Sequence, residues 1–396
     1  MGIGNISASI SASIVNLKAL TKEELRDLFE SLSLPEFRDR QLLKWIYEKR
    51  CTSISDITEF SKPLRQRLEA IAYIGNLDLT RKLLSADGTA KYLFRLEDGD
   101  SIESVLIPEA PQAPQESELA SGSLPQAGRM TNPRQPTKLP QEPNESQAPP
   151  RAGRLTLCIS SQAGCRMGCR FCLTGATGFR RNLGSFEIID QVLSVERDVY
   201  PGRHVTNVVI MGMGEPLDNF REVVRALWIL TEQTGISKRR ITLSTSGLVP
   251  EMARLFKEAP EVNLAISLNG TTNEQRQRVM PVNARYPIET LLSACRKLPL
   301  SPRRRITFEY VMLRGINDSM EDAVRLCALI KGIPSKVNLI PFNDYAGSVF
   351  KRPDDQNVLR FQEILTSRHV TAFIRKSMGA DILAACGQLR GPSSSA

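Results

Sequence analysis

Histidine is nearly absent from this chain. Only His204 and His369 occur among 396 residues, so proton transfer would fall mainly to carboxylates or thiols, and we interpret both histidines as structural. Long apolar runs are also lacking, because no stretch reaches the roughly 18 apolar residues that a membrane-spanning helix needs. We therefore expect no association with a membrane.

The first residues lack the features of a secretory signal. Residues 1–16 are uncharged and rich in Ser and Ile, without a basic start or a compact apolar core. A fragment of an organellar presequence is the alternative, although the stretch contains no Arg. The eight cysteines do not follow the pattern of a secreted disulfide framework in a chain of this length. We expect a reducing, cytoplasmic location.

Three of the cysteines stand close together in the sequence. Cys165, Cys169 and Cys172 have the spacing C-x3-C-x2-C, and the aromatic Phe171 precedes the last of them. Three thiolates in so short a loop can hold three corners of a [4Fe–4S] cluster, to which ordinary cluster proteins add a fourth cysteine. This loop has no fourth cysteine, so one iron would stay open to a ligand. The alternative is a zinc knuckle completed by a distant ligand.

The composition changes sharply at residues 109–152. This stretch is rich in Pro, Gln, Ser, Ala and Glu and has no aromatic or β-branched hydrophobic residue. It cannot bury enough apolar surface to offset the entropy lost on ordering. We predict a disordered insertion whose two ends lie close together.

The part before the insertion predicts two small units. Residues 17–75 show helical spacing of apolar residues, beginning at a capping box formed by Thr21 and Glu24. Alternating residues in 76–108 predict a short β connecting segment.

From residue 153 to residue 390 the patterns of strand and helix alternate six times. This alternation predicts an α/β fold, a parallel sheet curved into an open, partial (β/α)6 TIM-like barrel, with a doubly wound sheet as the alternative. Functional groups of such barrels gather at the carboxyl ends of the strands, where the cysteine loop also lies. The predicted strands are 155–159, 205–211, 241–244, 263–268, 306–313 and 336–340, and the predicted helices are 186–199, 219–234, 249–258, 287–297, 319–331 and 354–367.

Small or polar residues end several of the predicted strands. Glycine lets the backbone approach a ligand closely, carboxylates can hold an ammonium group, and hydroxyl or amide groups suit a ribose, a carboxylate or an adenine edge. Without the cysteine loop, each of these residues would be interpreted as a strand cap. The candidates are Gly214, Glu215, Ser244, Ser267, Leu268, Asn269 and Asn343.

The chain is basic, with a net charge of +9 and a pI of about 9.2. A basic surface suits a polyanion such as RNA. Four local clusters of basic residues predict a side of the molecule that faces phosphates. They are 180–181, 238–240, 303–305 and 375–376.

The cysteine loop resembles that of the radical S-adenosylmethionine (SAM) enzymes. Four further stretches, at 158–165, 212–216, 243–247 and 384–389, resemble the RlmN/Cfr family of RNA methyltransferases. The resemblance covers nearly all of 17–390 outside the insertion. It implies a radical SAM barrel with an N-terminal accessory domain that binds RNA.

The resemblance also implies a reaction. A [4Fe–4S] cluster on the three loop cysteines and two SAM molecules per turnover would methylate carbon 2 of an adenosine in 23S rRNA, and of adenosine in tRNA anticodon loops. Cys386 would carry the methyl group, Cys158 would release the product through a transient disulfide, and Glu103 would remove the ring proton. The implied electron donor is flavodoxin-like.

The sequence leaves open the contribution of Asn269 to SAM binding and the reaction itself. Asn269 stands where many relatives have His, although Asn can also donate and accept hydrogen bonds. The core motifs are shared with Cfr-type enzymes, which methylate carbon 8 of the same adenine and confer antibiotic resistance. A noncatalytic iron–sulfur protein that binds RNA is a third possibility, but it would need neither Cys158 nor Cys386.

Overall fold

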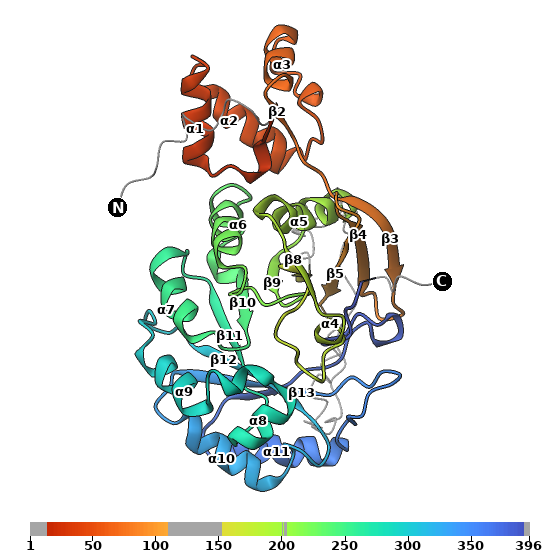
Figure 1. The fold of residues 1–396 in the computed structure, drawn as a ribbon, viewed down its shortest axis with the longest axis vertical. Coiled ribbons are helices and arrows are strands. Elements are labelled where there is room, and N and C mark those ends of the chain that lie inside the picture. The colour runs from red at the N-terminus through yellow and green to blue at the C-terminus, as the bar shows by residue number, and fades with distance from the viewer. Residues whose placement is uncertain (1–13, 110–152, 200, 202–203, 392–396) are drawn as a thin grey trace, which may run out of the picture.

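A computed structural model describes residues 14–109, 153–199, 201 and 204–391 (Figure 1). The predicted insertion at 109–152 lies outside these residues except for Glu109, and so do residues 1–13. The two ends of the insertion lie side by side, as predicted. Pro108 pairs with Leu155 on neighbouring strands, and the Arg154 N–H donates to the Glu109 carboxylate at 2.9 Å.

The body of the molecule is one sheet of ten strands. Its order is β14-β13-β12-β11-β10-β9-β6-β5-β4-β3. Strand β6 and the strands β9 to β14 are parallel to one another, and β5, β4 and β3 continue the sheet as antiparallel neighbours. The bounds are β3 Asp78–Leu84, β4 Ala90–Arg95, β5 Ser101–Pro108, β6 Leu155–Ile159, β9 Asn207–Ile210, β10 Ile241–Thr245, β11 Asn263–Ser267, β12 Ile306–Met312, β13 Ser335–Pro341 and β14 Ala372–Ile374.

The parallel strands lie in the sheet in the order in which the chain forms them. Crossovers between parallel strands are right-handed, so an unbroken order places all the crossover helices on one face. A doubly wound sheet would reverse its order and carry helices on both faces. The structure is therefore the predicted open, partial barrel, with helices around its outside (Figure 1). These are α5 Ser185–Val199, α6 Phe220–Glu232, α7 Val249–Glu258, α9 Ile288–Lys297, α10 Met320–Ile330 and α11 Asp355–Ser367. The short helix α8 Asn273–Val279 lies instead at the carboxyl ends of β10 and β11.

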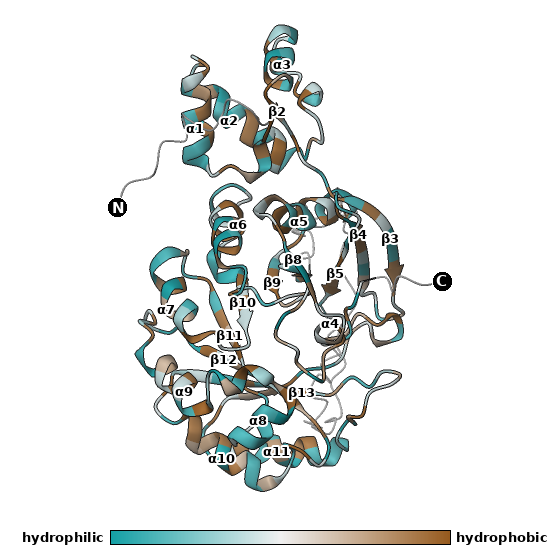
Figure 2. Cartoon of the chain, in the orientation of Figure 1, coloured by the Kyte–Doolittle hydropathy of each residue, from teal (hydrophilic) through white to brown (hydrophobic). Residues whose placement is uncertain are grey.

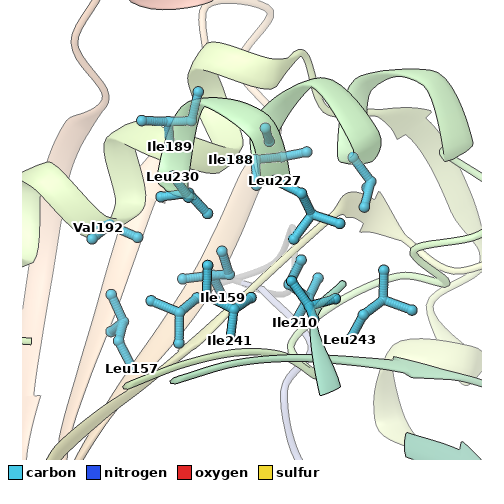
Figure 3. Close-up of a cluster of buried hydrophobic side chains, with 14 of the residues drawn as sticks. Leu157, Ile159, Ile188, Ile189, Val192, Ile210, Leu227, Leu230, Ile241 and Leu243 are labelled. Carbon is cyan, nitrogen blue, oxygen red and sulfur yellow. The ribbon is translucent and has the colours of Figure 1, made fainter. Parts of the chain in front are cut away.

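Alternate residues of the strands form the core beneath these helices. Leu157 and Ile159 of β6, Ile210 of β9 and Leu243 of β10 are fully buried against α5 and α6 (Figure 3). Burying each such side chain contributes roughly 1.5–3 kcal/mol. Successive residues of a strand point to opposite faces, so Cys158, between Leu157 and Ile159, points to the inner face of the sheet. Figure 2 shows the apolar residues gathered along the strands.

The N-terminal unit packs beside α5 and α6 (Figure 1). Thr21 and Glu24 form the predicted capping box, in which each side chain accepts a hydrogen bond from the other residue's backbone N–H. Arg225 of α6 donates to Glu24 and to the carbonyl of Ala19, which joins the unit to the barrel. The helices are α1 Lys22–Ser31, α2 Phe37–Leu43 and α3 Lys62–Glu69, with a π-helix at Lys44–Glu48, 3-10 turns at Leu17–Ala19 and Ile54–Asp56, and the short pair β1 Val15–Asn16 and β2 Ala72–Tyr73.

The structure differs from the prediction in several elements. The strands of the predicted connecting segment 76–108 belong to the same sheet as the barrel. A seventh parallel strand, β14, and the helix α8 were not predicted. Neither was the hairpin of β7 Gln162–Gly164 and β8 Phe179–Asn182, nor the short helix α4 Leu173–Ala176. None of the described helices combines the length and the apolar character that crossing a membrane requires.

Candidate active site

The register of the sheet places the candidate residues on one face. Cys158 pairs with Val105 of β5, and Glu103 lies two residues away on that strand, hence on the same side. Cys158 also pairs with Val209 of β9, and Val209 pairs with Thr242 of β10. Ser244 lies two residues beyond Thr242 and therefore on the same side. Further along the sheet, Ser267 belongs to the same inner face.

The cysteine loop runs from the end of β7 to the start of α4. Gly164 turns the chain into the loop at φ +73°, and a Cβ there would lie 1.9 Å from the Gly178 carbonyl oxygen. The Cys165 N–H donates to that same carbonyl at 2.9 Å, which closes the base of the loop. Cys172 is the N-cap residue of α4. Only glycine fits at position 164, because both the left-handed backbone and the close approach exclude a side chain.

The thiols of the loop interact with one another. Burial raises the pKa of Cys165 to about 12, and the Glu215 carboxylate and Cys172 act in the same direction. Burial raises the pKa of Cys169 well above its usual value, and Cys172 and Cys165 add to the rise. Among the described residues, no three His, Cys, Asp or Glu side chains converge on one metal ion. A [4Fe–4S] cluster does not require that convergence, because each thiolate binds a different iron.

Gly214 and Glu215 follow β9 and pack against Gln162 of β7, the strand that leads into the cysteine loop. Gly214 has φ +103°, and a Cβ would lie 2.7 Å from the backbone nitrogen of Gln162. The Glu215 carboxylate accepts the backbone N–H groups of Ser246 at 2.7 Å and Leu217 at 3.2 Å. Burial raises the pKa of Glu215, and these hydrogen bonds oppose the rise. The carboxylate is thus fixed at the carboxyl end of the sheet.

The predicted residues of the next two strand ends lie where expected, but one of them is already engaged. Ser244 and Ser267 are half-buried on the inner face, and Leu268 is fully buried. The Asn269 side chain accepts the Val311 N–H at 2.7 Å, and its amide contacts the Met280 sulfur at 3.2 Å. Asn269 therefore fixes the loop after β11, and its side-chain groups face protein partners.

The C-terminal segment, residues 379–390, brings Cys386 to the cysteine loop. The Leu173 N–H, directly after Cys172, donates to the Gly387 carbonyl at 2.8 Å. Asn343, which follows β13, donates from its amide to the Cys386 carbonyl at 3.1 Å and accepts from the Ser377 hydroxyl. Asn343 thus holds the cysteine segment in place.

Cys386 and Cys158 are far apart in the sequence, but the fold brings Cys386 near enough to influence the Cys158 thiol. Cys386 keeps an exposed surface and Cys158 is half-buried, and neither forms a disulfide. Burial raises the pKa of Cys158, and the Cys386 thiol adds to the rise. Although Cys386 keeps an exposed surface, the protein packed around its sulfur desolvates the thiol and raises its pKa, with Glu309 acting in the same direction and Arg375 against it.

Glu103 joins β5 to the C-terminal segment. One carboxylate oxygen lies 3.2 Å from the Lys91 ammonium, and the other accepts the Arg390 N–H at 3.1 Å. The Lys91 ammonium also donates to the Leu383 carbonyl at 3.2 Å. Since Glu103 and Lys91 are both buried, the carboxylate has a fixed orientation beside the segment that carries Cys386.

Sequence reasoning missed Glu309 on β12. Its carboxylate is buried on the inner face, paired with Ser267 of β11 in the register, and it accepts the Asn338 amide at 2.9 Å. Burial raises the pKa of Glu309 to about 7, although Asn338, Arg375 and Lys336 oppose the rise. The sequence did contain a signal for this buried carboxylate, because Glu309 stands alone among aromatic and β-branched residues in Thr307-Phe-Glu-Tyr-Val311.

The raised pKa of Glu309 predicts a dependence of stability on pH. Between the ordinary value of 4.5 and about 7, the folded protein binds more protons at this site than the unfolded chain, so stability falls as pH rises. Glu309→Gln keeps the oxygen that Asn338 contacts and removes the charge. Its stability relative to the parent should grow by roughly 3 kcal/mol between pH 4.5 and pH 8, measured by urea unfolding. Equal differences at both pH values, as expected for the surface control Glu363→Gln, would contradict the assignment.

The four basic clusters do not share one side of the barrel. Residues 238–240 directly precede β10 and residues 303–305 directly precede β12, so both clusters lie at the amino ends of the strands. Residues 375–376 follow β14 at the opposite end. Arg304 is also occupied, donating to Asn263 at 2.6 Å. The four clusters therefore do not form one basic face, and a phosphate-facing side built from some of them stays a prediction.

Comparison with known proteins identifies the class. A model of the radical SAM superfamily matches residues 159–327, and a model of the ribosomal RNA large subunit methyltransferase N-terminal domain matches residues 15–74. A radical SAM methyltransferase from Sphaerobacter thermophilus has a crystal structure that is similar at a TM-score of 0.80, with 37% identity, covering 95% of this chain and 99% of that chain. Fold and cysteine loop together define a radical SAM enzyme.

Curated relatives narrow the class. Proteins named dual-specificity RNA methyltransferase RlmN, from Pelobacter propionicus and Geotalea uraniireducens, are each 47% identical to this chain over 95% of its length and are covered over 96% and 97% of theirs. The chain belongs to the RlmN family of radical SAM RNA methyltransferases. Membership of this family excludes two alternatives that the sequence left open, a zinc knuckle and a noncatalytic iron–sulfur protein that binds RNA.

The residues present fit the [4Fe–4S] cluster and SAM that the radical SAM family implies. Cys165, Cys169 and Cys172 provide three thiol donors on one loop at the carboxyl end of the first barrel strand. The raised pKa values of Cys165 and Cys169 show that ionising these two thiols unaided is costly, as expected of ligands whose charge a bound metal offsets. The three donors are soft sulfur atoms, which suit iron–sulfur clusters.

Proposed function

We propose that this chain methylates carbon 2 of a specific adenosine in 23S rRNA, and of adenosine in tRNA anticodon loops, through a methyl group carried on Cys386. RNA methylation itself follows from the family. The observation that carries the finer proposal is the position of Cys386, held beside the cysteine loop and acting on Cys158.

The carrier role rests on the chemistry of the target atom. Carbon 2 of adenine is electrophilic, so ordinary donation of a methyl cation to it fails. A thiol can take the methyl group first and hold it next to the reaction centre, as Cys386 is positioned to do. When bound, the cluster and SAM would supply the reducing and hydrogen-abstracting chemistry that activates this methyl group.

Two residues would complete the reaction. Glu103 would accept the proton of the ring carbon, with Lys91 and the Arg390 N–H fixing its carboxylate. Cys158 would then attack the sulfur of Cys386 and release the methylated base, leaving a transient disulfide between the two thiols. This attack needs a thiolate and a sulfur leaving group in reach of one another.

The remaining inner-face residues would hold SAM. The buried Glu215 carboxylate would bind the SAM ammonium group, which would offset the cost of its burial. Gly214, Ser244, Ser267 and the backbone at Leu268 and Asn269 would line the rest of the cofactor site. Asn343 would contribute by placing the Cys386 segment rather than by reading an adenine edge.

The partners follow from the same proposal. The adenosine must leave its stack to reach an inner face, which is least costly in RNA loops. Residues 15–74 would bind the RNA outside the target base, and the relatives' name, dual-specificity RNA methyltransferase, supports both rRNA and tRNA as substrates. A flavodoxin-like donor would supply electrons in a reducing, cytoplasmic environment.

The direct test is nucleoside mass spectrometry of unmodified rRNA and tRNA. The RNAs are incubated with anaerobically reconstituted enzyme, reductant and SAM. The proposal expects 2-methyladenosine in both. 8-Methyladenosine would move the chain to the Cfr-type branch, and SAM cleavage without any methylated adenosine would overturn the substrate assignment.

A further inference from the structure

Arg276, on α8, is the largest fully buried side chain of the described residues, with an exposed fraction of 0%. All five N–H donors of a guanidinium can form hydrogen bonds in a fixed fork. Here each of the three nitrogens is engaged, and every acceptor is uncharged. The acceptors are the carbonyls of Ser246, Ser267, Leu268 and Tyr286 and the amide oxygen of Asn283, at 2.7–3.5 Å.

The charge of Arg276 has no carboxylate partner in the described part of the chain. The ionisable groups that act on it are the thiols of Cys169 and Cys295, while burial lowers its pKa to about 10. Burying an ion without a counter-charge is costly, because neutral acceptors replace only part of its hydration. Some anion within reach should therefore balance Arg276 in the working protein.

The cysteine loop is the candidate, because it carries the three thiols that would hold the cluster and because α8 packs against it. The helix of Arg276 contacts this loop directly, because the Arg170 N–H donates to the Val279 carbonyl at 3.0 Å. Phe171 packs on Val279 in the same contact. Three thiolates make a bound cluster anionic, and one-electron reduction adds a further negative charge.

We propose that Arg276 is the internal counter-charge of the iron–sulfur cluster, raising its reduction potential from behind the cofactor site. Because the guanidinium is wholly buried and its donors are occupied, it acts through its field and not by touching SAM or RNA. Net charge near a cluster is among the factors that set its potential. The charge of Arg276 would thus favour the transfer of an electron to the cluster, the step that starts each reaction.

The test is a potentiometric titration of the reconstituted cluster, followed by electron paramagnetic resonance. Arg276→Gln removes the charge, and Arg276→Lys keeps it. Asn283→Asp is the sharper variant, because Asn283 already accepts from Arg276 at 3.1 Å and an aspartate there pairs the charge without removing the arginine. Asn263→Asp, at the amino end of β11, is the matched control for an added carboxylate.

Arg276→Gln and Asn283→Asp should each lower the reduction potential of the cluster by at least about 59 mV. For one electron, this corresponds to a tenfold shift of the equilibrium toward the oxidised cluster. The reduction potentials of the Arg276→Lys and Asn263→Asp proteins should differ from that of the parent by less than about a third of this shift. A fully loaded Asn283→Asp protein with the parent potential would overturn the proposal.

Cluster-free protein gives a second measurement in case a variant does not load. There Arg276 lacks its counter-charge. Asn283→Asp also removes the N–H that donates to the Asn273 carbonyl at 3.2 Å, so its effect on the thermal midpoint is compared in the parent and in the Arg276→Gln background. The substitution should be tolerated better in the parent, and an equal or larger loss of midpoint there would overturn the proposal. None of these measurements uses RNA, so they stand apart from the test of adenosine methylation.

Discussion

Cys386→Ala should abolish RNA methylation while leaving RNA binding intact. The Cys386 thiol is the protein group that carries the methyl group in the proposed reaction, and removing a covalent nucleophile commonly costs at least about a thousandfold in turnover. Nucleoside mass spectrometry would measure the product, and filter binding would measure RNA affinity. The backbone of this segment is held by Asn343, Leu173 and Gly387, so the loss of one sulfur should not displace it.

Two other cysteines make this result interpretable. Cys327→Ala, on α10 and outside the site, should methylate as the parent does. Cys158→Ala should form the methyl-bearing adduct but fail to release it, so a covalent protein–RNA species should accumulate on denaturing gels. Methylation that survives in the Cys386→Ala protein would show that the methyl group does not pass through this thiol.

Local spacing made much of this site predictable. The loop cysteines lie within eight residues of one another, so their shared function does not depend on the fold. Strand β6 begins and ends as predicted, at Leu155 and Ile159, because its apolar residues alternate. The placement of Cys386 against Cys158 required the family resemblance, since no local pattern links positions so far apart.

The features that the sequence did not reveal depend on tertiary contacts. Strand β14 has three residues, Ala372–Ile374, which is too short for a periodic pattern. Helix α8 reads Asn-Glu-Gln-Arg-Gln-Arg-Val, which is typical of a solvated segment, yet its Arg276 is fully buried. Only the convergence of the carbonyls at the ends of β10 and β11 explains why a guanidinium belongs there.

The position of Glu103 illustrates a similar limit. In the sequence it is one carboxylate in an alternating strand, and nothing nearby predicts its contacts. In the structure it joins the Lys91 ammonium to the Arg390 N–H, three elements that come together only when the C-terminal segment crosses back to β4 and β5. Its expected role came from the resemblance, whereas its orientation comes from the fold.

Asp190→Ala should destabilise the protein by about 3–5 kcal/mol, the cost of leaving one partner of a buried ion pair without the other. The Asp190 carboxylate lies 2.6 Å from the Lys18 ammonium, and both side chains are fully buried. Burial lowers the pKa of Lys18, and Asp190 opposes the fall. Asp190 also accepts the Leu77 N–H at 2.7 Å, so one carboxylate holds both the N-terminal unit and the start of β3. Urea unfolding would measure the loss.

The matched control is an exposed pair of the same type. Glu59 lies 3.2 Å from Lys49, and both side chains are more than a third exposed, so Glu59→Ala should cost far less stability than Asp190→Ala. If Asp190→Ala costs no more than this control, the pair does not anchor the N-terminal unit.

The shape of the unfolding curve would show whether the N-terminal unit and the barrel unfold together or separately. Lys18 belongs to the unit that would bind RNA, and Asp190 to α5 of the barrel. A single transition at lower urea would mean that the two parts unfold together. An added early transition, with RNA affinity lost before barrel structure, would mean that the pair holds the accessory unit against a barrel that folds without it.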